Sequence, residues 1–183
     1  MATTVESDVV RATTVIGLVR DGRAAMAADG QVTLGDTVVK TTARKLRRLG
    51  DGTVLAGFSG SGADAFALLE KLEEKLESSR GNLPRAAVEM AREWRKDKYL
   101  RELQALVAAV DSGHTLMIGG AGDVVEAQDG IVCVGSGHAY ALAAARALQA
   151  HTNMKLSTIA RESIAIARKI CIYTGGEIQV EEL

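Results

Sequence analysis

Two adjacent threonines, Thr13 and Thr14, open the first β-prone run of the chain, directly after a polar segment with no packing pattern. A threonine at the start of a chain can be a complete catalytic unit, because its hydroxyl attacks a carbonyl carbon while its own α-amine takes the proton. The unperturbed pKa of such an amine is about 7.7–8, which suits a general base at neutral pH. While Ala12 is attached, the nitrogen of Thr13 is an amide, so cleavage of the Ala12–Thr13 bond would be the activating event. A threonine that begins a strand also serves β-propensity alone, and the pattern leaves both interpretations open.

Other catalytic motifs are incomplete. The run GFSGS at residues 57–61 resembles a G-x-S-x-G nucleophile elbow, but Ser61 occupies the place of the last glycine. Residues 120–122 (GAG) open like a dinucleotide-binding loop, but Val125 stands at the third glycine position. The sequence has no G-x-x-x-x-G-K-[ST] phosphate loop, so we do not expect the chain to hydrolyse ATP itself. We interpret these glycines as turn residues.

The flanking sequence predicts hairpin-linked strands and pairs of helices. Asp21-Gly22 and Asp51-Gly52 each separate two β-prone runs, which predicts two hairpins. Later strands are predicted at ALVAAVD, TLMIGG, GIVCVGS and EIQVEEL. Apolar spacing and start signals predict four helices: residues 64–79, from Pro84 to about Leu103, 138–150, and from Ser157 to about Ile172. Strands grouped in this way predict an α+β fold with largely antiparallel sheets, whose outer faces the helix pairs cover.

Composition indicates one globular domain. Of 183 residues, 47% are apolar and 25% are charged, enough to bury a core without disulfides. The 22 basic and 23 acidic side chains give a net charge of −1, so no basic excess favours nucleic acid or a membrane surface. Cys133 and Cys171 lie in apolar runs and are interpreted as core residues. With no apolar stretch of about 18 residues and no signal-peptide pattern, we expect a cytoplasmic, reduced protein.

A specific set of motifs runs through the chain: TT at a strand start, ADGQ-x-T-LG, K-x-RRL, AGF-x-G and GSG, in this order and spacing. On these motifs the chain resembles the HslV (ClpQ) family, proteasome-like peptidases of the N-terminal-nucleophile hydrolase superfamily, over nearly all of residues 13–183. The resemblance implies a four-layer α-β-β-α sandwich of two mainly antiparallel sheets. It implies a threonine-type endopeptidase, the proteolytic subunit of a two-component ATP-dependent protease. It also implies a homo-dodecamer of two stacked hexameric rings, and an HslU-like ATPase partner that unfolds polypeptide substrates and activates the peptidase allosterically.

The resemblance further implies a role for each matched residue. Thr13 would be the nucleophile and its α-amine the base. Lys45 would lower the pKa of the threonine groups, and Asp29 would keep this lysine charged and oriented. Ser136 would hydrogen-bond near the amine, and Gly57 would offer its backbone N–H to the oxyanion.

No cofactor is required for this chemistry. The resemblance does imply a bound cation, sodium-like or divalent, held by backbone carbonyls near a helix end. The matching positions are Arg168, Cys171 and Thr174. Gly175-Gly176 follows them, where the family often has bulkier polar residues.

Taken alone, the same residues allow plainer interpretations. Lys45 belongs to the basic run at residues 44–48, and such runs are usually solvated faces. Asp29-Gly30 is also a common turn pair, and Ser136 is well placed to cap a following helix.

Residues 1–12 are expected to be a prosegment, and residues 13–183 a single peptidase domain. Many family members have the initiator methionine directly before the first threonine, whereas twelve residues precede Thr13 here. Counting from Thr3-Thr4 puts the ADGQ motif and Lys45 at the wrong distance from the first threonine, so Thr13 is the matching residue. Residues 1–12 must then be removed, and self-cleavage at Ala12–Thr13 is the favoured hypothesis. Two alternatives stay open. One is a non-catalytic ring subunit of the same fold that keeps its prosegment, and the other is an N-terminal-nucleophile amidase that acts on small amides.

Overall fold

The structure is a computed structural model of residues 1–183, and it describes residues 10–11, 13–60, 62–96, 105–119 and 122–183. The strands in these ranges are β1 (Val10–Arg11), β2 (Thr14–Arg20), β3 (Arg23–Ala28), β4 (Val32–Leu34), β5 (Thr37–Lys40), β6 (Leu46–Leu49), β7 (Val54–Gly60), β8 (Ala105–Val110), β9 (Thr115–Gly119), β10 (Val124–Glu126), β11 (Ile131–Gly135) and β12 (Gln179–Glu182). The helices are α1 (Gly62–Ser78), α2 (Leu83–Lys96), α3 (His138–His151) and α4 (Leu156–Arg168).

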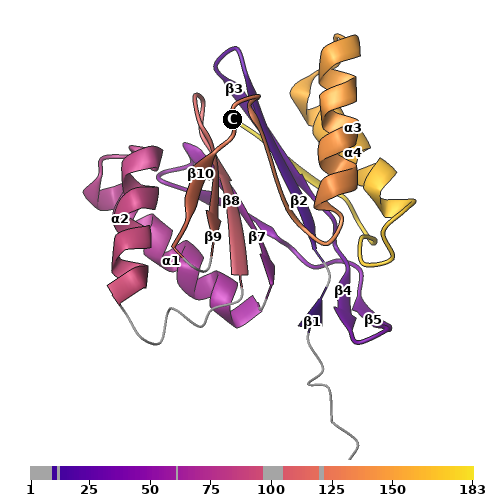
Figure 1. The fold of residues 1–183 in the computed structure, drawn as a ribbon, viewed down its shortest axis with the longest axis horizontal. Helices are drawn as coiled ribbons and strands as arrows, with labels where there is room; N and C mark the ends of the chain where they lie inside the picture. The colour runs from indigo at the N-terminus through magenta and orange to yellow at the C-terminus, as the bar shows by residue number, and fades with distance from the viewer. Residues whose placement is uncertain (1–9, 12, 61, 97–104, 120–121) are drawn as a thin grey trace, which may run out of the picture.

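Two antiparallel sheets form the inner layers of the molecule (Figure 1). One has the strand order β10-β9-β8-β7-β6 and the other the order β11-β2-β3-β12. Helices α1 and α2 cover the outer face of the first sheet, and α3 and α4 cover the outer face of the second (Figure 1). A small sheet of order β1-β4-β5 projects beyond the N-terminal end of β2 (Figure 1). The layers are therefore α-β-β-α, which confirms the predicted sandwich.

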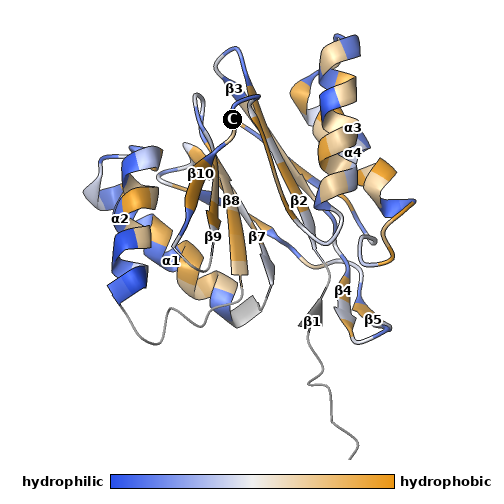
Figure 2. Ribbon diagram, in the orientation of Figure 1, coloured by the Kyte–Doolittle hydropathy of each residue, from blue (hydrophilic) through white to orange (hydrophobic). Residues whose placement is uncertain are grey.

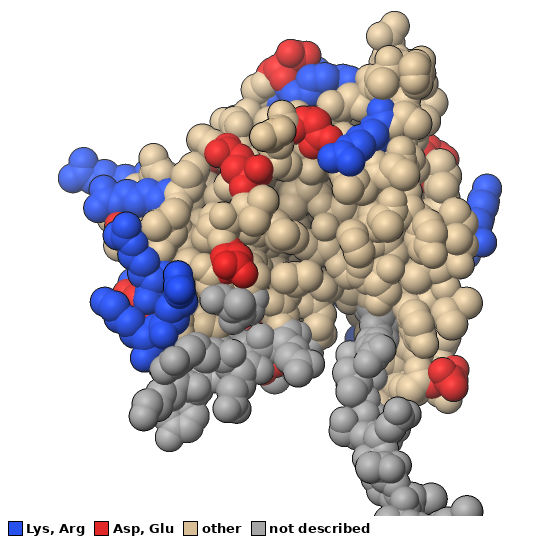
Figure 3. Space-filling model, in the orientation of Figure 1, with Lys and Arg blue, Asp and Glu red and all other residues tan. Residues whose placement is uncertain are grey.

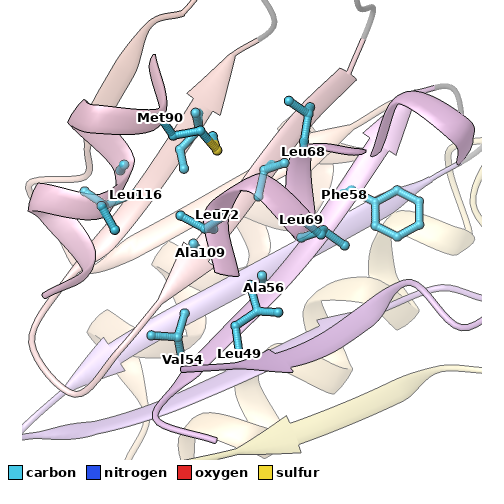
Figure 4. Close-up of a cluster of buried hydrophobic side chains, with 14 of the residues drawn as sticks. Leu49, Val54, Ala56, Phe58, Leu68, Leu69, Leu72, Met90, Ala109 and Leu116 are labelled. Carbon is cyan, nitrogen blue, oxygen red and sulfur yellow. The ribbon is translucent and has the colours of Figure 1, made fainter. Parts of the chain in front are cut away.

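Apolar side chains fill each of the three spaces between layers, and the strands facing them are mostly hydrophobic in Figure 2. Helix α2 buries Ala87, Met90 and Trp94, spaced at threes and fours, so one apolar stripe faces the sheet. Figure 4 shows the core beneath α1 and α2, where Leu72 and Met90 lie over side chains of the sheet such as Ala109. On the face drawn in Figure 3, Lys and Arg gather mainly over α2 and are elsewhere interspersed with Asp and Glu.

The turn residues explain the two predicted hairpins, and both predictions are confirmed. Asp21 and Gly22 have φ angles of 53° and 73°, the left-handed values that a two-residue hairpin turn requires between β2 and β3. Asp51 and Gly52, with φ angles of 55° and 85°, lie in the turn between β6 and β7. Each turn fixes the register of its strands and so fixes which side chains face the interior.

Some elements differ from the predictions. The hairpin β4–β5 and strand β10 were not predicted, because most of their side chains are exposed or half-buried and give no alternating pattern. Helix α4 ends at Arg168, about four residues before the predicted end, and a chain of turns follows. The predicted extension of α2 from residue 97 to Leu103 lies outside the described residues. In the described part of the chain, no helix has the length and apolar character needed to cross a membrane.

Candidate active site

Thr13 is buried and lies immediately before β2, which belongs to the sheet of order β11-β2-β3-β12. The carbonyl oxygen of Thr13 accepts a hydrogen bond from the Ser136 N–H at 2.8 Å. One residue further on, the Thr14 carbonyl accepts from the Asp29 N–H at 3.2 Å. Backbone bonds to both flanking strand ends therefore hold the start of β2 in place.

The carboxylate of Asp29, directly after β3, is fully buried and accepts four hydrogen bonds. The donors are Thr14 N (2.7 Å) and Lys45 Nζ (2.9 Å) to Oδ1, and Gln31 N (3.1 Å) and Gly175 N (3.0 Å) to Oδ2. A buried carboxylate is tolerated only when its oxygens are satisfied in this way. Asp29 thus connects the start of β2, the lysine and the loop after α4, and the plain turn interpretation is incomplete.

Lys45 lies immediately before β6 in the other sheet, and its side chain is only 4% exposed. Its ammonium donates to Asp29 Oδ1 at 2.9 Å and to the Gln31 carbonyl at 2.6 Å. Burial lowers the pKa of Lys45 because it disfavours the charged form, and the nearby Asp29 carboxylate opposes this shift. Within the basic run, Arg44 and Arg48 are exposed, as a solvated face predicts, but Lys45 is not.

Thr13 and Lys45 both line a cavity of about 570 Å³. Its other lining residues are Val32, Lys40, Thr42, Ala43, Arg44, Arg47, Phe58, Gly60 and Phe66. With Lys45 included, the lining residues hold four cations and no carboxylate, and the guanidinium of Arg47 lies 5.4 Å from the centre of the Phe66 ring. The cavity therefore offers apolar surface and a positive potential beside a hydroxyl that could attack a carbonyl.

Gly57 lies in the middle of β7, paired with Leu46 on one side and Ala108 on the other. A Cβ at Gly57 would come within 2.6 Å of Val15 Cγ1, so the missing side chain lets the two sheets pack. Gly57 is not among the residues that line the cavity, whereas Gly60, at the end of β7, is. Gly60 has a φ of 111° and was read in sequence only as a turn residue.

Ser136 is exposed, and the contact that the structure shows with Thr13 runs through its backbone N–H. The predicted cation ligands Arg168, Cys171 and Thr174 lie in order along the last residue of α4 and the turns after it. The Thr174 N–H donates to the Cys171 carbonyl at 3.1 Å, and both side chains are buried.

Three contributors to this site were missed in the sequence. Thr14 Oγ1 lies 2.7 Å from Thr174 Oγ1 and accepts from the Gly137 N–H at 3.0 Å. Gln31 supplies its carbonyl to Lys45, and Gly175 supplies its N–H to Asp29. The adjacent threonines were a visible signal for Thr14, but no local pattern marks the other two.

Comparisons with known proteins agree with this geometry. The proteasome-subunit family matches residues 9–183. The ATP-dependent protease subunit HslV of Chlorobium luteolum is 58% identical over 175 residues, covering 96% of each chain. The chain belongs to the HslV family. The HslV of Syntrophobacter fumaroxidans is 55% identical, over 96% of this chain and 98% of the relative.

Comparison with solved structures also supports membership of the HslV family. The crystal structure of eukaryotic HslV from Trypanosoma brucei is 42% identical, with a TM-score of 0.87 over 93% of this chain and 98% of that one. Thiobacillus denitrificans BPH, at 21% identity and a TM-score of 0.70, shares the fold. As a member of the HslV family, the protein is a threonine-type peptidase of the N-terminal-nucleophile hydrolases.

Proposed function

We propose that the mature protein begins at Thr13 and cleaves polypeptides with this residue, as the proteolytic subunit of an ATP-dependent protease. The observation that carries the proposal is the buried Lys45–Asp29 pair at the cavity that Thr13 lines. Structural lysines are rarely buried, whereas a lysine with a lowered pKa beside a candidate nucleophile is typical of active sites.

The chemistry assigned to these residues is acyl transfer. The Thr13 hydroxyl attacks the substrate carbonyl while the α-amine accepts its proton, and the amine product then leaves with a proton. The ester on Thr13 Oγ is hydrolysed by water, which restores the hydroxyl. The Lys45 ammonium lowers the pKa of both groups on Thr13, and Asp29 keeps the ammonium charged and oriented. The backbone N–H of Gly57 or, nearer the cavity, of Gly60 is the candidate donor to the oxyanion.

Three further parts of the proposal concern assembly. The relatives are named ATP-dependent protease subunits, and this sequence has no phosphate loop, so the energy would come from a separate HslU-like ATPase. Exposed apolar side chains on the β4–β5 hairpin (Leu34, Val38, Val39) support contacts between subunits of a ring. We propose two stacked hexamers, and native mass spectrometry should show twelve chains.

We also propose that a cation binds in the turns after α4. The carbonyls of Arg168, Cys171 and Thr174 lie at a helix C-terminus, where the peptide dipoles favour positive charge. Among the described residues, no group of three or more His, Cys, Asp or Glu side chains could hold a metal, so carbonyls are the available ligands. A bound cation would stabilise the loop that presents Gly175 to Asp29. Thermal unfolding in sodium, potassium and a large organic cation should separate a specific site from an ionic-strength effect.

The deciding experiment is the intact mass of the purified protein, alone and after treatment with a threonine-directed covalent inhibitor. We expect a chain that starts at Thr13 and gains one inhibitor. The Thr13→Ala variant should keep residues 1–12 and gain none, and Lys45→Ala should assemble without turnover. Lys155→Ala, an exposed lysine at the start of α4, is the matched control and should behave as the parent protein.

The two alternatives give different results. A wild-type chain that keeps residues 1–12 and takes no inhibitor would be a non-catalytic ring subunit. Turnover of small amides without stimulation by any ATPase would indicate an amidase. Efficient removal of the prosegment from Thr13→Ala would contradict self-cleavage.

A further inference from the structure

The last part of the prosegment that the structure describes is a strand. The backbone of β1 pairs antiparallel with β4, with Val10 opposite Leu34 and Arg11 opposite Thr33. This strand lies at the edge of the small sheet that projects beyond β2 (Figure 1). A prosegment that served only as a blocking group on Thr13 would not need to pair with the mature chain.

The register shows that this pairing continues the hairpin of β2 and β3. Val15 lies opposite Ala28 in the β2–β3 ladder, and Arg11 lies opposite Thr33 in the β1–β4 ladder. Between these two pairs, the chain from Arg11 to Val15 covers four steps, whereas the opposing chain from Ala28 to Thr33 covers five. The partner therefore carries one extra residue between Ala28 and Thr33, the arrangement of a β-bulge.

The extra residue falls in the segment that holds the active-site contacts. Asp29 and Gln31, between β3 and β4, both bind the Lys45 ammonium through their oxygens. In sequence, the Ala12–Thr13 bond lies between the residues of the two ladders. The chain is thus held at Thr14–Val15 on one side of the bond and at Val10–Arg11 on the other.

We propose that the backbone pairing of Val10–Arg11 with Thr33–Leu34 positions the prosegment for self-cleavage at Ala12–Thr13. The inference rests on the proposed function and adds a positioning strand to it. In the reaction, Thr13 Oγ bonds to the carbonyl carbon of Ala12 while the bond from this carbon to the Thr13 nitrogen breaks. The hydroxyl proton is transferred, in the net reaction, to that nitrogen. Water then hydrolyses the ester, leaving a carboxylate on Ala12 and a hydroxyl and a free amine on Thr13.

Holding the chain on both sides of the bond limits the freedom of the reacting groups, which raises their effective concentration. A two-residue ladder is too short to be stable by itself once the covalent link has been cut. The same pairing therefore accelerates cleavage and still allows the prosegment to leave.

The test uses two prolines as controls for each other. In an antiparallel ladder, neighbouring residues alternate between pointing their N–H at the partner strand and pointing it away. Either Val10 or Arg11 therefore donates to β4, and proline removes that donor at one position only. We expect one of the variants Val10→Pro and Arg11→Pro to slow the appearance of the Thr13 chain by about tenfold or more. The other proline, and the side-chain variants Val10→Thr and Arg11→Lys, should be processed within about twofold of the parent.

A second measurement locates the effect. In the uncleavable Thr13→Ala background, hydrogen exchange should show slower exchange of the β4 amides with the natural prosegment. That protection should be lost with the proline that slows processing and kept with the other. Equal rates for both proline variants, whether fast or slow, would overturn the proposal, as would unchanged exchange in β4.

The outcome can be separated from that of the proposed function. An N-terminal fusion cut by an unrelated protease directly before Thr13 gives the same mature chain for every prosegment variant. If that chain hydrolyses peptides while both proline variants lose the prosegment at the rate of the parent, only the proposed positioning role of β1 is wrong. If that chain is inactive, the proposed function fails instead.

Discussion

The ammonium of Lys45 lies 2.9 Å from the carboxylate of Asp29, and each side chain is 4% exposed or less. Apart from the lysine, Asp29 accepts bonds from three backbone N–H groups. These three donors remain when the lysine is replaced, so the carboxylate should tolerate the loss of its partner.

The two single variants should therefore differ in cost. Asp29→Asn removes the counter-charge that Asp29 gives to the buried ammonium, which should lower the free energy of unfolding by about 3–5 kcal/mol. Lys45→Met leaves the carboxylate with three donors and should cost less, about 1–3 kcal/mol. Urea unfolding in the Thr13→Ala background measures both without interference from processing. Equal losses would contradict the inequality, and neither variant should hydrolyse peptides in the Thr13 background.

The lowered pKa of Lys45 predicts how activity and stability depend on pH. Activity should fall on the alkaline side at a pH below 10.5, the ordinary value for lysine, because the ammonium gives up its proton early. For stability, the unfolded chain binds more protons between the folded pKa and 10.5, so the free energy of unfolding rises with pH in this window. Below the folded pKa the cost of burying the charge is present in full.

The Lys45→Met variant is the control for this prediction. The stability of the parent relative to Lys45→Met should increase as the pH rises from about 7 toward about 10. A constant difference over this range, measured by urea unfolding, would mean that the pKa of Lys45 is not lowered in the folded chain.

Gly30 connects Asp29 to Gln31, and a Cβ there would overlap the carbonyl oxygen of Thr41 and come within 3.0 Å of that of Glu177. Both are backbone atoms, which cannot rotate away as the end of a side chain can. Gly30→Ala should cost about 1–3 kcal/mol of stability and reduce turnover, because the two flanking residues hold Lys45. Gly113→Ala is the control. A Cβ there would lie 3.8 Å from Asp111 Oδ1, an ordinary contact, so this variant should change stability by less than about 0.5 kcal/mol.

The parts of the fold that local chemistry determines could be predicted from the sequence. Asp-Gly pairs require left-handed φ angles, and the apolar stripe of α2 requires a buried face, so these elements have visible signals. The β4–β5 hairpin lacks such a signal because all four residues of β5 are exposed. Strand β5 is formed by pairing with β4, and β4 in turn pairs with strand β1 of the prosegment.

The candidate site was predictable as a set of residues through resemblance, and not as a geometry. Lys45 reaches Asp29 across 16 residues of sequence, and Gly175 reaches the same carboxylate across 146. No periodicity connects positions so far apart. The glycines of β7 show the same limit, because composition does not reveal that Gly57 faces the other sheet while Gly60 faces the cavity.

The hydroxyls of Thr14 and Thr174, 2.7 Å apart and buried, connect the residue after the nucleophile to the loop after α4. Thr14→Val removes this bond and also leaves the Gly137 N–H without the acceptor that the structure gives it. We expect a loss of about 1–3 kcal/mol for Thr14→Val and a smaller loss, about 0.5–1.5 kcal/mol, for Thr174→Val. Urea unfolding of both variants in the Thr13→Ala background measures these values.

The double variant completes a thermodynamic cycle for this pair. Once Thr14 is valine, the Thr174 hydroxyl has already lost its partner, so adding Thr174→Val should cost almost nothing further. The measured loss for the double variant should therefore stay close to that of Thr14→Val alone. If the two single losses simply add, the hydroxyls are not coupled, and the loop after α4 does not stabilise the start of β2 through this contact.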